Sequence, residues 1–106
     1  MTAISLDELA KLCKDPETRK TLHIIDVSSK EHFAKEHIAY AFNVPLEDLE
    51  KKKESGLPPD RTVVVYGENP EDAAKGAEKY RSMGYKVLVY QEGVAAWRAA
   101  ELPVAA

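Results

Sequence analysis

The sequence predicts an α/β domain in which helices cover both faces of a parallel sheet. Residues 22–27 form a short apolar run that closes on Asp26, as in a buried strand with a polar residue at its exit. Residues 62–66 carry β-branched side chains on successive positions, which is typical of a central parallel strand buried on both faces. Segments with helical capping signals alternate with these runs along the chain. This alternation favours a parallel sheet between two layers of helices.

The first helix is predicted from a capping box. Ser5 can cap the helix start, while Glu8, three residues later, can bond back to the Ser5 backbone. The apolar residues that follow recur at helical spacing as far as Cys13, and the pair Asp15 and Pro16 ends the helix. After the strand at 22–27 we expect a short helix at 28–35, an extended segment at 41–45 and a charged helix at 46–55.

In the second half, the strand at 62–66 leads through a short loop into a helix. Asn69 is a good N-cap, Pro70 suits the first helical position, and Gly84 ends the helix. A strand at 86–90 and a helix at 93–100 complete the pattern. The carboxyl ends of parallel strands share one rim, where ligands bind, so we expect Asp26 and Gly67 to lie on that rim together.

The composition narrows the function classes. The chain has 106 residues, of which 44% are hydrophobic and 31% charged, so we expect one domain over residues 1–106. Its net charge of −3 gives no footprint for nucleic acid or an anionic membrane. No apolar run reaches the roughly 20 residues of a membrane span, and charged residues near the start argue against a secretory signal. We therefore expect a cytoplasmic protein, and one cysteine allows no internal disulfide.

The loop at residues 67–72 has the setting of a catalytic loop without its chemistry. Backbone N–H groups at a helix start suit an anionic nucleophile or ligand. Gly67, however, stands where a reactive thiol would sit, and the loop carries Glu68, Glu71 and Asp72 but no arginine. We interpret these acids as stabilising the helix start, by about 0.3–1 kcal/mol each, in preference to binding a cation or an amine.

The order of the motifs resembles the rhodanese-like family over nearly the whole chain. The matching pieces are Asp26-Val27, His37-Ile38, the segment from Ala41 to Leu46, the strand ending at Tyr66, Gly84-Tyr85, and Gly93 to Trp97. The resemblance implies a three-layer α/β fold with a central five-stranded parallel sheet. Active members of the family pass a sulfane sulfur from a donor such as thiosulfate to an acceptor through a cysteine persulfide.

The departures from the family pattern fall on the residues that perform its chemistry. Gly67 occupies the position of the persulfide cysteine, and Ser28 replaces the arginine of the Asp-Val-Arg motif. Asp72 replaces an arginine that active members often carry five residues after the cysteine. Glycines of the family are replaced at Glu36, Tyr40 and Glu92. The sequence therefore predicts a rhodanese-like domain with no catalytic residue of the usual kind.

We expect a binding or regulatory module with a pocket at the rim, and no metal or cofactor. Its partner would be an unknown protein or a small ligand. Within this site we expect Asp26 to accept N–H bonds and His37 to order the segment beside it. The predicted site residues are Asp26, Ser28, His37, Tyr40, Gly67, Glu68, Asn69, Pro70, Glu71 and Asp72.

Three other interpretations stay open. Cys13, the only thiol, lies on the apolar stripe of the first helix and is interpreted as a core residue. The enzyme alternative is a sulfurtransferase or sulfur-relay protein that uses Cys13 or a partner's thiol. A second alternative is a scaffolding domain with a vestigial pocket. Metal binding by Asp26, His32 and His37 is a minor third.

Overall fold

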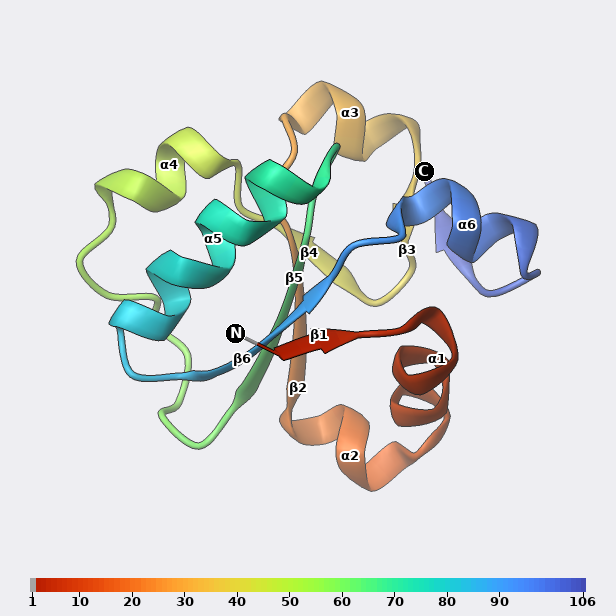
Figure 1. The fold of residues 1–106 in the computed structure, drawn as a ribbon, viewed down its shortest axis with the longest axis horizontal. Coiled ribbons are helices and arrows are strands. Elements are labelled where there is room, and N and C mark those ends of the chain that lie inside the picture. The colour runs from red at the N-terminus through yellow and green to blue at the C-terminus, as the bar shows by residue number, and fades with distance from the viewer. Residues whose placement is uncertain (1) are drawn as a thin grey trace.

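The computed structural model describes residues 2–106 and contains a central sheet of five parallel strands. The strand order across the sheet is β1-β6-β5-β2-β4 (Figure 1). The strands are β1 (Thr2–Ile4), β2 (Leu22–Asp26), β4 (Ala41–Asn43), β5 (Thr62–Tyr66) and β6 (Lys86–Tyr90). The predicted three-layer α/β fold with its five-stranded parallel sheet is confirmed.

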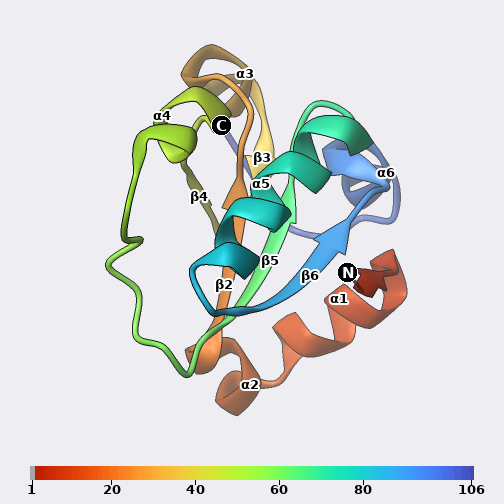
Figure 2. The same ribbon diagram turned by 60° about the vertical axis from the view of Figure 1, so that its left-hand side comes forward.

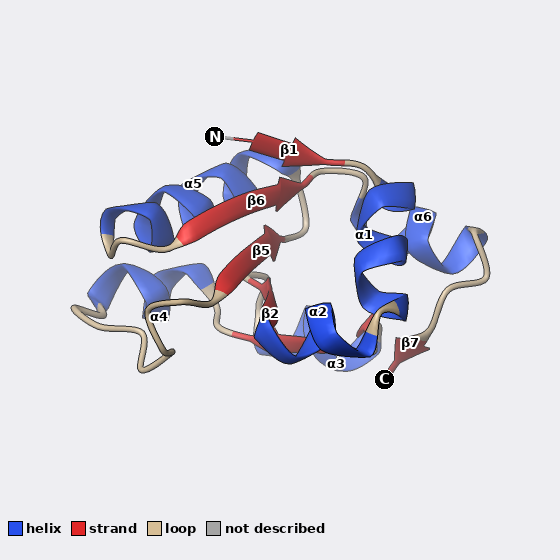
Figure 3. Cartoon of the chain, turned by 90° about the horizontal axis from the view of Figure 1, so that it is seen from below, coloured by secondary structure: helices blue, strands red, loops and turns tan. Residues whose placement is uncertain are grey.

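Helices lie on both sides of this sheet, as Figure 3 shows. One face is covered by α4 and α5, and the other by α1 and α6, so the three layers follow the two apolar faces of the strands. No helix among residues 2–106 is long and apolar enough to span a bilayer. The helices are α1 (Leu6–Lys14), α2 (Pro16–Thr21), α3 (Lys30–Lys35), α4 (Leu46–Lys51), α5 (Pro70–Ser82) and α6 (Gly93–Ala99).

The strand β5 feeds a separate core on each of its faces. Val63 and Val65 pack into a cluster with Leu49, Ala77 and Tyr80 beneath α4 and α5. Val64 and Tyr66, which point the other way, join a cluster with Leu9, Cys13 and Trp97 beneath α1 and α6. Successive side chains of a strand point to opposite faces, which explains why the run of valines has no polar position.

Two small elements were not expected from the sequence. The strand β1 adds the fifth member of the sheet, pairing with β6 so that Ile4 lies opposite Tyr90. Near the carboxyl terminus, β7 (Val104–Ala105) pairs antiparallel with β3 (His37–Ile38) in a short ribbon. Two- and three-residue strands carry too few positions to show a period-two pattern.

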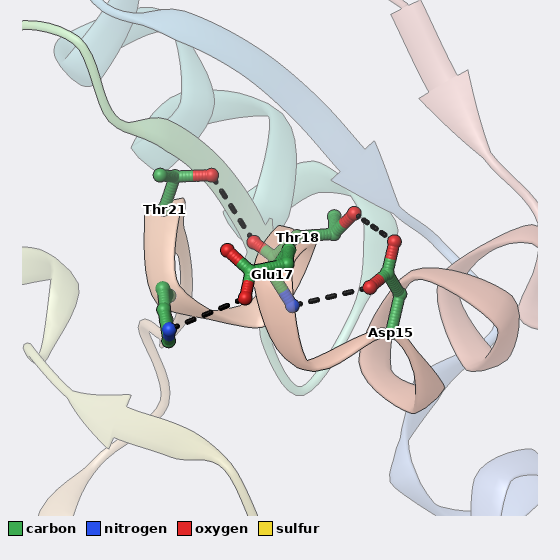
Figure 4. Close-up of polar contacts among 5 residues, drawn as sticks. Asp15, Glu17, Thr18 and Thr21 are labelled. Atoms are coloured by element: carbon green, nitrogen blue, oxygen red, sulfur yellow. Dashed lines mark hydrogen bonds and ion pairs between the residues drawn. The ribbon is translucent and has the colours of Figure 1, made fainter.

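The helix α2 was also missed, because none of its residues is buried. Its start is fixed by Asp15, whose carboxylate accepts the Glu17 backbone N–H at 3.1 Å and the Thr18 hydroxyl at 2.8 Å (Figure 4). At its end the Thr21 hydroxyl donates to the Thr18 carbonyl at 3.1 Å. The expected helix at 46–55 is shorter than predicted and ends at Lys51. The segment 52–61 then runs down one side of the molecule to the start of β5, as Figure 2 shows.

Candidate functional site

The carboxyl ends of β2 and β5 meet, as expected, at one rim of the sheet. Asp26 is the register partner of Tyr66, and Gly67 follows directly. The Val27 backbone N–H donates to the Tyr66 carbonyl at 2.9 Å, which continues the contact one residue past the strand ends. The geometry therefore brings Asp26, Ser28 and the loop at residues 67–72 to the same end of the fold.

Gly67 is held close to the core of the domain. A Cβ built on Gly67 would lie 3.0 Å from Cγ2 of Val27 and 3.6 Å from Cβ of Asp72. The glycines with a positive φ are Gly56, Gly84 and Gly93, so the backbone at Gly67 has a conformation open to other residues. What glycine allows here is close approach to the Val27 methyl, and it leaves the loop without a nucleophile.

The loop after Gly67 satisfies its helix start with its own side chains. Asn69 Oδ1 accepts the Asp72 backbone N–H at 2.9 Å, and Asn69 Nδ2 lies 3.4 Å from Asp72 Oδ2. Pro70 is the first residue of α5 and brings no N–H that needs a partner. The predicted N-cap is confirmed, and it uses part of the donor set that would otherwise face an anion.

Asp26 and Ser28 form a buried corner where β2 ends. Asp26 is 1% exposed and Ser28 is 3% exposed. One carboxylate oxygen of Asp26 accepts both the Ser28 backbone N–H, at 2.9 Å, and the Ser28 hydroxyl. Asn43 Nδ2 donates to the carbonyl oxygens of Asp26 and Ser28, each at 2.9 Å. Asp26 does accept an N–H bond as expected, and the corner is a closed structural element.

Tyr66 connects this corner to the ribbon formed by β3 and β7. Its hydroxyl oxygen accepts the Ile38 backbone N–H at 3.0 Å, and the side chain is 1% exposed. Burial, and then the neighbouring Asp26 carboxylate, raise the pKa of Tyr66 far above its usual value. Tyr66 therefore stays neutral and acts as a structural hydrogen-bonding group.

His37 orders the segment before β4, as the sequence predicted. Its ring stacks on Phe33, with 3.6 Å between ring centroids and 9° between planes. Its Nδ1 lies 2.7 Å from the Phe33 carbonyl oxygen. Beside it, Glu36 pairs with Arg98 of α6 at 2.5 Å. These contacts attach the end of α3 to α6.

Tyr40 does not belong to the rim, which corrects its predicted place. It precedes Ala41, whose register partner is Ile24, and Ile24 lies two residues before the carboxyl end of β2. The Arg19 guanidinium lies 5.1 Å from the centroid of the Tyr40 ring, a cation–π contact that draws the ring toward α2. The prediction rested on a position in the family pattern, while the direction of β4 determines where Tyr40 lies.

Cys13 is a core residue, as interpreted from the sequence. It is 4% exposed and belongs to the cluster beneath α1 and α6, whereas Gly67 contacts Val27 on the opposite face of the sheet. Burial raises the pKa of the Cys13 thiol, and the nearby Arg19 offsets this only in part. A raised pKa and low exposure both suppress the thiolate that sulfur chemistry requires.

The exposed surface of the rim is acidic. Glu68 and Glu71 are exposed at the start of α5. Glu92 follows β6, and its Oε2 accepts the Leu6 backbone N–H at 2.6 Å, where α1 begins. Asp7 lies in the first turn of α1 on the same side. Sequence reasoning missed the contribution of Asp7, because only the adjacency of β1 and β6 brings α1 to the rim. Glu92 lies there because it follows the carboxyl end of β6.

The minor metal hypothesis finds no support from the geometry. Among residues 2–106, no three His, Cys, Asp or Glu side chains come close enough together to hold a metal ion. The Asp26 carboxylate accepts a hydrogen bond from the Ser28 backbone N–H, and the His37 ring stacks on Phe33.

Taken together, the fold and the site define a three-layer α/β domain with Gly67 at the head of the loop between β5 and α5. A comparison with protein families matches residues 5–100 to the rhodanese-like domain. The chain therefore belongs to the rhodanese-like family, as its motifs indicated. A comparison with curated proteins finds no match.

Solved structures of several bacterial proteins share the fold. The Rhodanese_3-like domain of an Anabaena sp. protein is 30% identical, with a TM-score of 0.72, over 80% of this chain and 99% of that one. A Bacillus halodurans protein is 21% identical, with a TM-score of 0.85, over 98% of this chain and 76% of that one. A Rhodopseudomonas palustris protein of unknown function, described as a possible tyrosine phosphatase, is 22% identical, with a TM-score of 0.80, over 99% of this chain and 85% of that one. At 21% and 22% identity, the last two comparisons show only that the fold is shared.

Proposed function

We propose that this rhodanese-like domain does not carry sulfur itself and acts as a binding or regulatory module through its rim. The observation that carries the proposal is the contact between Gly67 and Val27. A persulfide needs a thiolate at the head of the loop, and the Cβ position of Gly67 lies 3.0 Å from a core methyl group. The loop is thus packed for glycine as well as lacking the thiol.

The surroundings of Gly67 also oppose the binding of an anionic sulfur donor. The Ser28 hydroxyl turns inward to Asp26 and offers nothing to the rim surface. Glu68, Glu71 and Asp72 surround the helix start, where thiosulfate or phosphate would have to bind. The same features oppose a phosphatase, since that chemistry also needs a thiolate and a cation that clamps phosphate.

The accessible part of the rim is suited to a partner with positive charge. Asn69, Pro70, Glu68 and Glu71 are exposed, whereas Asp26 and Ser28 are buried. The partner class is a protein or a small ligand; a chain of net charge −3 offers little to nucleic acid or an anionic membrane. The single cysteine is free, and cysteines without a disulfide are usual in the reducing cytoplasm. We propose the cytoplasm as the location of this domain.

The enzyme alternative is favoured by one observation, a cavity beside Cys13. This cavity of about 160 Å³ is lined by Cys13, Arg19, Tyr40 and Trp97, among others. A cation next to a thiol is the usual way to activate it. Burial nevertheless raises the pKa of this thiol, and the cavity lies away from the rim, so we rank a sulfurtransferase second.

An assay of sulfur transfer from thiosulfate to cyanide distinguishes the binding module from the sulfurtransferase. We expect the isolated chain to give no turnover above that of buffer, because neither Gly67 nor Cys13 supplies a thiolate. Turnover that disappears in Cys13→Ser would establish the enzyme alternative. Turnover that persists in Cys13→Ser would contradict both hypotheses.

An NMR titration tests the binding role against a vestigial pocket. With a hexa-arginine peptide as the probe, we expect shifts at the backbone amides of residues 67–72. Glu71→Gln should weaken them, while Glu54→Gln, exposed in the segment far from the rim, serves as the matched control. Shifts spread evenly over all acidic residues would support the vestigial pocket.

A further inference from the structure

The strand β4 leaves one edge of the sheet open and carries an unusual side chain there. Phe42, at the centre of this three-residue strand, is 59% exposed and is the one large hydrophobic residue exposed among residues 2–106. Its only aromatic neighbour in that range is His23, with ring centroids 6.2 Å apart. An open edge with an apolar centre is a template for another strand.

The backbone of β4 presents hydrogen-bonding groups outward. The Val44 N–H donates to the Asp26 carbonyl at 3.0 Å, so the backbone groups of Val44 and Phe42 face β2. Alternate residues of a strand direct these groups to opposite sides. Ala41 and Asn43 therefore point their N–H and C=O groups away from the sheet.

The two ends of this edge carry opposite charge. Where β4 begins, a cavity of about 370 Å³ is lined by Arg19 and Lys20 together with Phe42, and by no acidic residue. Past its carboxyl end, a cavity of about 200 Å³ is lined by Glu31, Glu47 and Asp48, with Lys30 as the one cation. Lys20 also pairs with Glu17 at 3.3 Å, so among residues 2–106 Arg19 is the cation without an acidic partner at the end where β4 begins. The edge thus runs from an end with Arg19 and Lys20 to an acidic end.

We propose that two copies of this chain associate through their β4 strands, antiparallel about a twofold axis at Phe42. In this register Ala41 lies opposite Asn43 of the second copy, and each such pair can exchange two backbone hydrogen bonds. Phe42 then faces Phe42 of the second copy in the closer, non-hydrogen-bonded position, with Cα atoms about 4.5 Å apart. Both rings lie on the same face of a sheet that continues through both copies.

The charges favour a second copy of the chain over an unrelated strand. Antiparallel pairing sets the basic end of one copy, at Arg19 and Lys20, beside the acidic end of the other, at Glu47 and Asp48. The twofold axis repeats this match, as an isologous interface requires. A uniformly acidic or basic peptide would match one end and be repelled at the other.

The interface is small, so the dimer is expected to be weak. Three-residue strands with flanking charges bury less than the roughly 1,200 Å² that marks stable complexes, which points to a dissociation constant of about 0.01–1 mM. Its contacts also leave the rim at residues 67–72 free, so dimerisation and the proposed binding role can fail independently.

Sedimentation velocity at low salt over about 0.01–1 mM protein tests the dimer. We expect a concentration-dependent dimer that Phe42→Ser abolishes. Lys20→Glu and Glu47→Lys, both at exposed positions, should each weaken it by about tenfold or more. An equimolar mixture of these two variants should restore it, because each variant supplies the charge that the other lacks. Lys75→Glu on α5 makes the same charge change elsewhere and should have no effect.

Three outcomes would overturn the proposal. A monomer at every concentration would exclude the dimer, and a dimer unaffected by Phe42→Ser would place the contact elsewhere. A mixture of the charge variants that associates no better than each alone would exclude the antiparallel register. Circular dichroism of each variant confirms that a loss of association is not a loss of fold.

Discussion

A Cβ built on Gly67 would lie 3.0 Å from Cγ2 of Val27, so any side chain at this position crowds a methyl group of the core. Val27 is 2% exposed and is held between the end of β5 and the start of α4: its N–H donates to the Tyr66 carbonyl and its C=O accepts the Leu46 N–H. This close approach limits the room for a side chain at the head of the loop.

The fit between these two residues can be measured as a free energy of unfolding. Gly67→Ala should lower stability by about 1–2 kcal/mol, because Val27 must shift to admit the new methyl group. The loss should be smaller when Val27→Ala is already present, since the two residues share one space. Urea unfolding of the four proteins gives the coupling. Equal losses in both backgrounds would show that Val27 does not limit this position.

The acidic loop should suppress a thiol placed at its head. In a Cys13→Ala background, the Gly67→Cys thiol should react with iodoacetamide about three- to tenfold faster once Asp72→Arg is added, because a nearby cation favours the thiolate. Asp60→Arg, before β5 at the other end of the strand, is the control with the same charge change. Equal rates for all three proteins would show that Asp72 does not govern the electrostatics of the loop.

The cap of α5 contributes to stability independently of function. Asn69→Ala removes the acceptor of the Asp72 N–H, a bond of 2.9 Å, and should cost about 1 kcal/mol in the free energy of unfolding. Glu68→Ala, one residue earlier and exposed, should change it little. If Glu68→Ala costs as much as Asn69→Ala, the loop is stabilised by its charge and not by its cap.

His23 should make the domain less stable in mild acid. Both of its ring nitrogens are buried without a partner, and burial, followed by Arg61, lowers the pKa of His23 below the ordinary value of 6.5. The unfolded chain therefore binds a proton near pH 6.5 that the folded chain does not, so stability falls as the pH drops below that value. Urea midpoints at about pH 7.5 and 5.5 should drop more for the native chain than for His23→Leu. An equal drop of the urea midpoint in the two proteins would show that the pKa of His23 is not lowered by folding.

Much of the fold could be predicted because local signals and burial agree. The valines of β5 indicate a strand buried on both faces, and Asn69 with Pro70 marks the start of α5. The same type of signal, Asp15 with Pro16, begins α2, although in the sequence it indicates only the end of α1. Without an apolar stripe to follow, a cap alone was not enough to identify a helix.

The site was predictable where it follows from strand ends and not where it depends on pairing between distant strands. Asp26 and Gly67 share a rim because parallel strands end together. Tyr40 was misplaced because its position depends on the register of β4 against β2. The acidic contribution of Asp7 depends on β1 beside β6, which no local pattern indicates.

The central claim is that this rhodanese-like chain does not carry sulfur, and intact-protein mass after incubation with thiosulfate tests it most directly. We predict an unchanged mass, with Cys13 modified only when denaturant exposes it. A stoichiometric gain equal to the mass of one sulfur atom in the folded chain, lost on treatment with cyanide, would contradict the account.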